Sequence, residues 1–549
     1  MMLWPASVLL LPLLGLAQTS GPAQASSSYK IAGVVVDSTN GQPLSAANVS
    51  IYGSENRELA WHVTTASDGR FLFSALPAGK YTLTGSAHGY RAQGFHQHGD
   101  YFVGIAIGPN LDSEHITFRL VADARIEGKM LDDSGEPVRQ ASVSLYLRNA
   151  DSGRQLTRQL TSAATDDRGH YMFSHLSPGT YFVSVSARPW FAQYSNSSEA
   201  PSDPDDATRS AEERAQLDVA YPMTFYPSVE DSSGASAIVL RPGDRVTADI
   251  TVRAVPAVHL RIRNGDASGS LSTAVRGFPR LSQRIFEGTL VPVGIAQASS
   301  ASPNSYDYTG IAPGHYIVEL PDSSRPGRAG WYQEMDLNGT VELDPSGSPP
   351  LVSVSGMLAL EGNERRPPGQ IYVVLANRAT SETFVAEVKA NGSFEFAESD
   401  IRPGSYDLVI QNAPGYQVKT LTAHGAHVHG QSIQIAASRI ELAVTATNAL
   451  ARVTGVVLAG DQPHPGAMVV LVPRATGSSP TLFRRDQSDS DGTFTLLEVI
   501  PGSYLVIAIE DGWDLDWASP SVLQPFLKDA ALVEVNGEMK LNVKVQLQR

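Results

Sequence analysis

The 549-residue chain contains no cysteine. This absence excludes disulfide bonds, zinc sites built on thiolates, iron–sulfur clusters, a thiol nucleophile and a lipid anchor attached to cysteine. Charged residues are also scarce, at 18%, and the formal net charge is −15. An acidic chain repels phosphate backbones, so we expect no nucleic-acid partner. Stability must come from packing, for which a hydrophobic content of 42% is sufficient.

Long apolar runs are few. Residues 3–16 form one, and the small residues 23–25 (Ala-Gln-Ala) follow it, as is typical of a secretory signal peptide and its cleavage site. No Lys or Arg precedes the run, the first being Lys30, so only the amino terminus supplies the usual positive charge. No later run reaches the ~18 to 20 apolar residues of a membrane helix. We expect residues 1–25 to be a signal peptide and the mature chain, without a membrane span, to be secreted or to lie in the periplasm or cell envelope.

Glycine (47) and proline (35) are abundant, as is typical of turn-rich β proteins. The chain repeats itself five times, and each copy contains Gly-x-aromatic-x-apolar, a short turn ending in glycine, and x-Tyr-x-apolar. The copies start with Gly69, Gly169, Asn304, Gly392 and Gly492, and their tyrosines are Tyr81, Tyr181, Tyr316, Tyr406 and Tyr504. In the third copy Asn304 stands where the others have glycine, and asparagine is the next-best residue at a positive φ. Asp-Gly and Pro-Gly turns separate strands whose aromatic and aliphatic residues share one buried face.

A second pattern precedes each motif except the third. A glycine (Gly33, Gly128, Gly356 or Gly455) begins an alternating strand, as we interpret it, and a second strand follows. In the third copy the segment 258–262 alternates, but it has no Gly-x-Val opening. The spacing between copies, about 90 to 135 residues, suits one small β-sandwich per copy.

The order of these motifs is most complete in copy one: Gly33-x-Val-x-Asp37, Pro43-Leu-x-x-Ala-x-Val-x-Ile51, Asp68-Gly-x-Phe-x-Phe73, Leu76-Pro-Ala-Gly-x-Tyr81. It resembles the carboxypeptidase regulatory-like domain family. The resemblance implies a transthyretin-like β-sandwich, a fold grouped with carbohydrate-binding sandwiches. It also implies an accessory or adhesive module of the kind found beside peptidases and on surface proteins, whose motif carries no catalytic residue.

We therefore predict an all-β protein, a tandem array of about five Greek-key, transthyretin-like β-sandwich domains forming a rod or an arc. The expected domains are residues 29–121, 123–255 with a polar insertion at 195–216, 256–347 as a degenerate copy, 350–447 and 450–549.

Motifs that carry chemistry are not apparent. The sequence has no nucleophile elbow, phosphate loop, HExxH or dinucleotide fingerprint, and no room for the catalytic domain of a zinc carboxypeptidase. Histidines cluster at His96 and His98 and again at His424, His427 and His429. On a strand, His427 and His429 point to one side, as two metal ligands would, but the same pattern also occurs on solvated surfaces. We expect no metal and no cofactor, with His427 and His429 as the metal candidates.

Two acidic runs invite a calcium hypothesis: Asp486, Asp489 and Asp491, and Asp511, Asp514 and Asp516. Neither supplies the ligand spacing of a helix-loop-helix calcium loop. The pair Asp491-Gly492 is already explained as the repeated turn. A loose calcium site at a domain junction stays open as an alternative.

Tryptophans are the candidates for ligand binding, because sugar-binding sandwiches stack sugars on exposed rings. Trp190 and Trp513 each follow their repeat's tyrosine by nine residues, where copy one has Tyr90, which favours a structural plug. Three tryptophans have no counterpart in the other copies and are therefore the ligand-binding candidates: Trp61, Trp331 and Trp517. Trp61 lies in an alternating segment, so half-burial is the alternative for it.

The sequence thus favours an exported, non-enzymatic multidomain binding or spacer protein whose partner is a polysaccharide or a cell-surface protein. The alternative is an accessory scaffold subunit for a separately encoded envelope enzyme or exporter. A hydrolase built on this scaffold is a third reading, against which stands the lack of any nucleophile, base and orienting group that the sequence would assemble.

Overall fold

The computed structural model describes residues 28–549 except for 55–57, 151–152, 194–215, 264–278, 287, 295–296, 299–304, 322–328, 344–351, 363–368, 378–382, 397–400, 402, 437–438, 475–479 and 537–539. The expected signal peptide and polar insertion lie outside the described residues, apart from Gln216. Strands dominate, and the described helical segments are short: η2 (Ser232–Gly234), η4 (Pro480–Leu482), η5 (Gly512–Asp514), α2 (Pro520–Leu523) and η6 (Gln524–Leu527). None of the helices in these ranges is long and apolar enough to cross a membrane.

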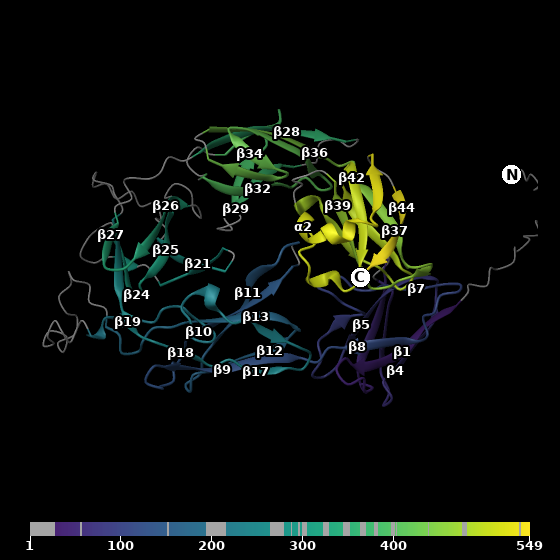
Figure 1. Cartoon of the computed structure of the whole chain (residues 1–549), viewed down its shortest axis with the longest axis horizontal. Helices are drawn as coiled ribbons and strands as arrows, with labels where there is room; N and C mark the ends of the chain where they lie inside the picture. Colours follow the sequence, from purple (N-terminus) through teal and green to yellow (C-terminus); the bar gives the residue numbers. More distant parts are fainter. Residues whose placement is uncertain are drawn as a thin grey trace, which may run out of the picture.

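In the described residues the strands form five successive two-layer units, which we call domains 1 to 5 (Figure 1). This confirms the predicted all-β, tandem-sandwich fold. In domain 1 one sheet has the order β4-β1-β8, with bounds β1 (Tyr29–Asp37), β4 (Arg70–Leu76) and β8 (Ile116–Leu120). The facing sheet contains β2 (Asn48–Gly53), β3 (Ala60–Thr64), β5 (Gly79–Ser86), β6 (Gln93–Gly94) and β7 (Ile105–Ile107).

Domain 2 repeats this arrangement. One layer contains β9 (Ala124–Asp132), β12 (His170–Leu176), β17 (Arg245–Thr247) and β18 (Ile250–Val252). The other contains β10 (Ser142–Asn149), β11 (Leu156–Ala164), β13 (Gly179–Ser186), β15 (Thr224–Phe225) and β16 (Ile238–Leu240). A two-stranded sheet of β14 (Val219–Ala220) and β19 (Val255–Pro256) stands at its boundary with domain 3.

Domain 3, the copy with the degenerate opening, also has two layers, each a four-stranded sheet. The first contains β20 (Val258–Arg263), β23 (Gln297–Ala298), β24 (Ser305–Ile311) and β27 (Val341–Leu343). The second contains β21 (Arg280–Ile285), β22 (Thr289–Pro292), β25 (Gly314–Pro321) and β26 (Ala329–Leu337). Loss of the opening motif therefore does not remove a layer.

Domains 4 and 5 complete the chain. In domain 4 the first sheet contains β28 (Ser353–Glu361), β31 (Ser393–Glu395), β33 (Gln417–His424) and β36 (Arg439–Thr447). The second sheet of domain 4 contains β29 (Tyr372–Asn377), β30 (Thr383–Glu387), β32 (Gly404–Gln411), β34 (Ala426–His429) and β35 (Ser432–Ile435). In domain 5 they contain β37 (Ala451–Ala459), β38 (Gln462–Pro463), β41 (Thr493–Val499) and β44 (Lys540–Gln548), and β39 (Met468–Pro473), β40 (Arg484–Gln487), β42 (Gly502–Ile509) and β43 (Ala531–Val535). The strand β44 pairs with both layers of domain 5.

The glycine of the opening pattern lies in the middle of its strand, not at the start as we expected. In domain 1, Gly33 is paired with Phe71 on one side and with Ile116 of the parallel strand β8 on the other. A Cβ atom at Gly33 would lie 2.1 Å from the carbonyl oxygen of Ile116, so no larger residue fits. Gly128, Gly356 and Gly455 meet the corresponding carbonyls at 2.2, 2.5 and 2.3 Å. The glycine thus allows the first strand of each of these domains to pair closely with the last one. In domains 2, 4 and 5 the aromatic ring of the motif also packs against the glycine.

The repeated tyrosine locks the turn before it. The hydroxyl of Tyr81 donates to the carbonyl of Pro77, 3.0 Å away and four residues upstream. The same bond recurs from Tyr181 to Ser177, from Tyr316 to Ala312 and from Tyr504 to Ile500. This arrangement is similar to the tyrosine corner of other β-sandwiches, in which a buried ring also satisfies a turn carbonyl.

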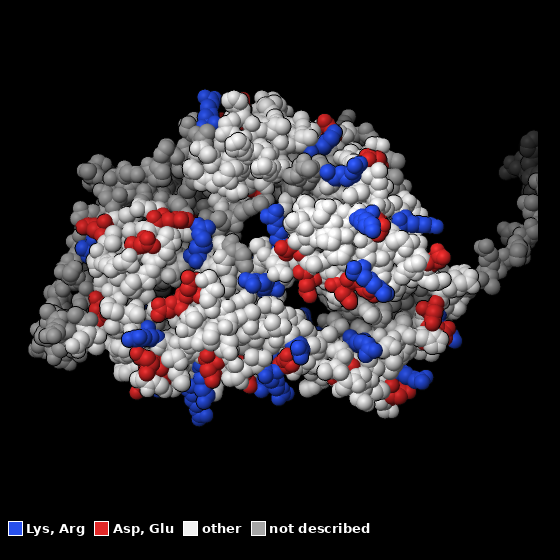
Figure 2. Space-filling model, viewed as in Figure 1, with Lys and Arg blue, Asp and Glu red and all other residues white. Residues whose placement is uncertain are grey.

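The domains do not form an open rod or arc. Domains 2 and 3 meet through an apolar cluster in which Phe286 of domain 3 lies 5.2 Å from the ring of Tyr146 and 5.1 Å from that of Phe182. Domain 5 returns to domain 1 and also touches domain 2, so the arc closes into a ring (Figure 1). Figure 2 shows this face of the ring hollowed near its centre, with charges of both signs interspersed.

Candidate functional site at the closure of the ring

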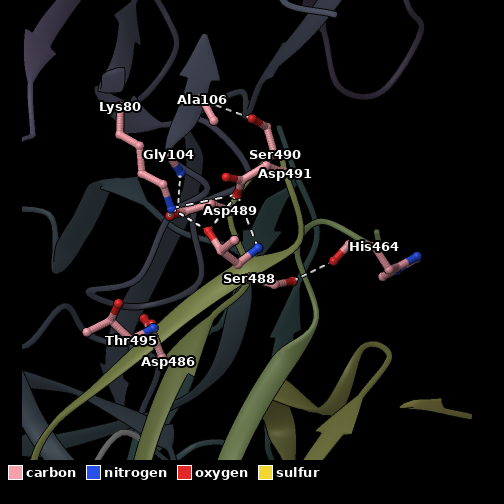
Figure 3. Close-up of polar contacts among 11 residues, drawn as sticks. Lys80, Gly104, Ala106, His464, Asp486, Ser488, Asp489, Ser490, Asp491 and Thr495 are labelled. Atoms are coloured by element: carbon pink, nitrogen blue, oxygen red, sulfur yellow. Dashed lines mark hydrogen bonds and ion pairs between the residues drawn. The ribbon is translucent and has the colours of Figure 1, made fainter. Parts of the chain in front are cut away.

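The contact between domains 1 and 5, which we call the seam, is built on the turn that precedes β41. Asp491 and Gly492 form the repeated motif turn, with Gly492 at φ 75°. The carboxylate of Asp491 accepts hydrogen bonds from the backbone N–H and hydroxyl of Thr493, at 3.1 and 2.6 Å. The turn is thereby fixed within domain 5, and its two preceding residues, Asp489 and Ser490, are presented to domain 1 (Figure 3).

Both of these residues pair with the backbone around β7. The Oδ1 atom of Asp489 accepts from the N–H of Gly104 at 2.9 Å, and the Oγ atom of Ser490 accepts from the N–H of Ala106 at 2.8 Å. The N–H of Ser490 donates to the carbonyl of Gly104 at 2.9 Å. A Cβ at Gly104 would lie 2.8 Å from Asp489 Oδ1, so a larger residue there would displace this carboxylate.

Lys80 supplies the opposing charge. Its Nζ atom donates to Asp489 Oδ2 and lies 3.6 Å from Asp491 Oδ1 (Figure 3). Burial raises the pKa of Asp489, and the ammonium of Lys80 opposes that rise. In the same cluster, burial raises the pKa of Asp486 to about 6, although the N–H of Thr495 donates to it at 2.6 Å. Asp489 and Asp491, two members of the acidic run considered for calcium, therefore already face the ammonium of Lys80.

Aromatic stacking forms the second part of the seam. The imidazole of His98 lies parallel to the ring of Trp513, with centroids 4.7 Å apart and 3° between the planes. The Nε2 atom of Gln487 donates to the carbonyl of His96 at 2.9 Å and lies 3.2 Å from His98 Nδ1. Burial lowers the pKa of His98, so the stack contains a neutral ring at pH 7.

The guanidinium of Arg485 lies among three aromatic rings. Its centre is 4.9 Å from the ring of Tyr101 in domain 1, and 5.6 and 4.9 Å from those of Trp513 and Trp517 in domain 5. Arg485 is 9% exposed. A cation this far removed from water gains most from the negative faces of aromatic rings.

Trp517 also connects domain 5 to domain 2. Its Nε1 atom donates to the carbonyl of Ala150 at 2.8 Å, and the N–H of Ala518 donates to the carbonyl of Gly153 at 2.9 Å. A Cβ at Gly153 would lie 2.3 Å from that of Ala518. Asp516 accepts from the N–H of Gln155 at 2.7 Å. This member of the second acidic run thus serves as an interdomain acceptor.

The tryptophans chosen from the sequence lie in different settings. Trp517 is 8% exposed in the interface with domain 2, so its ring is not free to stack on a ligand. Trp61 lies in β3, partly buried, with its ring 5.9 Å from that of Tyr81. Trp331 lies in β26, and its side chain falls outside the described residues.

The two expected structural plugs also differ. Trp513 is partly buried, but it packs against His98 and Tyr101 of domain 1 instead of lying at the end of its own strand. Trp190 is 83% exposed, and the ring of Phe191 lies edge-to-face beside it at 5.8 Å. The plug prediction for Trp190 was wrong, because the chain leaves β13 in that region and carries the ring out to solvent.

His427 and His429 occupy exposed alternate positions of β34, facing the same side as predicted from their spacing. Across the described part of the chain, no group of three or more His, Cys, Asp or Glu side chains is placed to hold a metal ion.

Sequence reasoning did not find the residues that join the domains, such as Lys80, Gly104 and Arg485. Lys80 and Asp489 are separated by 409 positions, and neither departs from its repeat's pattern in a way that signals a partner. Asp489 was noticed only as part of a possible calcium site, and His98 only as a member of a histidine cluster. The sequence signal that could have pointed to the interface was Asp489, an acidic residue before a motif turn that the repeat pattern does not explain.

Comparison with known proteins gives a family match in two regions. No curated protein matches the chain. Among solved structures, the minor pilin GBS52 of Streptococcus agalactiae is 14% identical, with 42% of this chain and 97% of that chain covered and a TM-score of 0.21. The TIE protein of Bacillus anthracis is 9% identical, with 96% and 76% covered and a TM-score of 0.17. Two B repeat units of the collagen-binding protein of Staphylococcus aureus are 11% identical, with 76% and 100% covered and a TM-score of 0.12. TM-scores this low do not establish a shared arrangement of the whole chains.

The family match covers the two copies whose motifs are most complete. Residues 30–99 and 125–207 match the carboxypeptidase regulatory-like domain. This confirms the resemblance inferred from the motifs, and the chain therefore carries carboxypeptidase regulatory-like domains in these two regions.

Proposed function

We propose that the protein is an exported, non-enzymatic binding or spacer protein whose five domains work as one closed unit. The observation that carries this proposal is the double docking of domain 5, on Lys80 of domain 1 and on Ala150 of domain 2. A chain that returns to its own first domains keeps its loops at fixed distances, and fixed geometry lowers the entropy lost when a large partner binds.

A polysaccharide or a cell-surface protein is the partner class we propose. Trp190 supports it, because its ring is 83% exposed and tryptophan is over-represented at binding hot spots. By analogy, the resemblance of the fold to carbohydrate-binding sandwiches supports a polysaccharide partner.

The test is binding of residues 26–549 to a glycan array and to insoluble cell-wall and plant polysaccharides. We expect saturable binding that Trp190→Ala weakens. The matched control is Met172→Ala, which removes another exposed apolar side chain of domain 2, 54% exposed on β12. Trp61→Ala and Trp331→Ala test the two remaining sequence candidates in the same assay.

The alternative function, an accessory scaffold subunit for an envelope enzyme or exporter, predicts a different outcome. The purified protein would then bind no polysaccharide and would co-purify from its native envelope with one partner. Turnover of any member of a broad substrate panel by the purified chain would contradict the non-enzymatic part of the proposal.

A further inference from the structure

A cleft of about 380 Å³ lies between domains 1 and 5, beside the seam. Domain 1 contributes β8 and the loop that follows β6, and domain 5 contributes Pro465, Gly466 and Ser490. This volume is within the range of small-molecule sites. Because both domains line the cleft, a molecule bound there would contact both sides of the ring closure.

Arg119 gives the cleft a positive charge. It occupies an exposed position of β8, between the core residues Phe118 and Leu120. Burial and the charge of Arg119 together lower the pKa of His96, so the guanidinium acts on that imidazole. No carboxylate among the described residues forms an ion pair with Arg119. The net charge of the chain is −15, yet the guanidinium of Arg119 has no such carboxylate partner, so it is available to bind an anionic ligand.

His96 is held in an unusual backbone conformation at the cleft. Its φ is 48°, in the left-handed region that few residues other than glycine adopt. Its carbonyl accepts from Gln487 of domain 5, and its ring lies 4.4 Å from that of Phe95. Backbone strain of this kind tends to occur at functional positions.

The remaining polar groups leave the anion position uncontested. The one lining carboxylate, Asp112, has both oxygens 3.0 Å from Nδ1 of His115 and accepts from the N–H of Glu114. Ser490 accepts from the N–H of Ala106 and so retains its own hydroxyl proton for donation. The apolar part of the lining includes Phe95 and Pro465 together with Val103 and Ile105, which are 1% and 2% exposed.

We propose that this cleft binds a small organic carboxylate, with its charged group on Arg119, His96 and Ser490 and its body against Phe95 and Pro465. Arg119 supplies the ion pair, and neutral His96 and Ser490 supply hydrogen bonds that fix its orientation. This inference rests on the proposed binding function and gives it a first site. The carboxylate belongs either to an acidic sugar or to an aromatic acid. The two differ in the ring that packs against the apolar lining, a sugar ring or an aromatic ring.

The test is isothermal titration of the full mature chain with glucuronate, benzoate and uncharged glucose. We expect a carboxylate to bind and glucose to bind far more weakly. Tighter binding of glucuronate identifies an acidic sugar, and tighter binding of benzoate an aromatic acid. Arg119→Gln should weaken carboxylate binding roughly tenfold or more, since hydrogen bonds to charged groups contribute about 1.5 to 3 kcal/mol. The matched control is Arg70→Gln, which removes an exposed arginine of domain 1 paired with Asp68.

A second readout is independent of the affinity. Bound carboxylate should slow hydrogen exchange at the N–H groups of Gly104 and Ala106, because a ligand that needs both domains stabilises the closed seam. Equal binding by Arg119→Gln and the parent, glucose binding as tight as glucuronate, or no binding of either carboxylate would overturn the site. Trp190-dependent polysaccharide binding, together with no binding of either carboxylate, would overturn the cleft alone and leave the proposed function standing.

Discussion

Removal of the Lys80 ammonium should open the seam. In Lys80→Met the apolar stem is kept and the charge is lost, so Asp489 stays enclosed beside Asp491 with no cation facing it. An exposed ion pair contributes up to about 1 kcal/mol and a buried one costs about 3 to 5 kcal/mol to break. The side chains of Lys80 and Asp489 are 37% and 22% exposed, which places this pair between the two cases, at about 2 kcal/mol. That value corresponds to roughly 30-fold in the equilibrium between closed and open ring.

Hydrogen exchange measures this equilibrium at the seam itself. The N–H groups of Gly104 and Ala106 are held by Asp489 and Ser490 of domain 5, so their exchange in the full chain should accelerate roughly 30-fold in Lys80→Met. Lys30→Met, an exposed lysine elsewhere in domain 1, is the control. Adding Asp489→Asn should recover part of the loss, because the stranded charge is then gone. Unchanged exchange in Lys80→Met would refute the electrostatic account of the seam.

Three further predictions concern the motif and the pH response. Gly33→Ala should destabilise domain 1 by about 3 kcal/mol, because the added Cβ clashes with the Ile116 carbonyl, and hydrogen exchange in β1 and β8 should become faster. The control Gly108→Ala should change little, because a Cβ there has its nearest contact at 3.8 Å. Equal effects of the two substitutions would contradict the close-pairing argument. Tyr504→Phe should cost about 1 to 2 kcal/mol by leaving the Ile500 carbonyl unsatisfied, measured by calorimetry of the full chain, and no shift of the domain 5 transition would argue against the turn lock. Burial lowers the pKa of His98, so the open chain takes up its proton more readily and closure weakens as pH falls below about 6.5. Asp486, whose pKa burial raises to about 6, acts in the opposite sense. His98→Phe, compared with the parent at each pH, should therefore show less acid-induced exchange at Gly104, and identical profiles would rule out His98 as the acid-sensitive group.

The sequence predicted the fold because its motifs are local. Asp-Gly turns, alternating apolar residues and a tyrosine four residues after its carbonyl partner all act within one hairpin, so they can be read from neighbouring positions. The role of Gly33 could not be read in this way. Its close partner, Ile116, belongs to a strand 83 positions later, and the glycine was therefore taken for the start of a strand.

The seam was not predicted for a similar reason. Whether Trp517 faces solvent or Ala150 depends on the angles between five domains, which no local pattern determines. The acidic run around Asp489 was noticed, but a nearby lysine from the first domain is a simpler partner for it than calcium. For Trp190 the error was the opposite one. Its spacing is equivalent to that of Tyr90, and burial was predicted from this, but the side chain is exposed.

The most direct test of the account is a distance across the seam. The chain has no native cysteine, so spin labels at Asp100→Cys in domain 1 and Asp461→Cys in domain 5 are specific, and both positions are exposed. A closed ring predicts one narrow distance distribution at the separation found here, broadened by Lys80→Met. A broad distribution at longer distances in the parent protein would contradict ring closure, and with it the proposal that the five domains act as one unit.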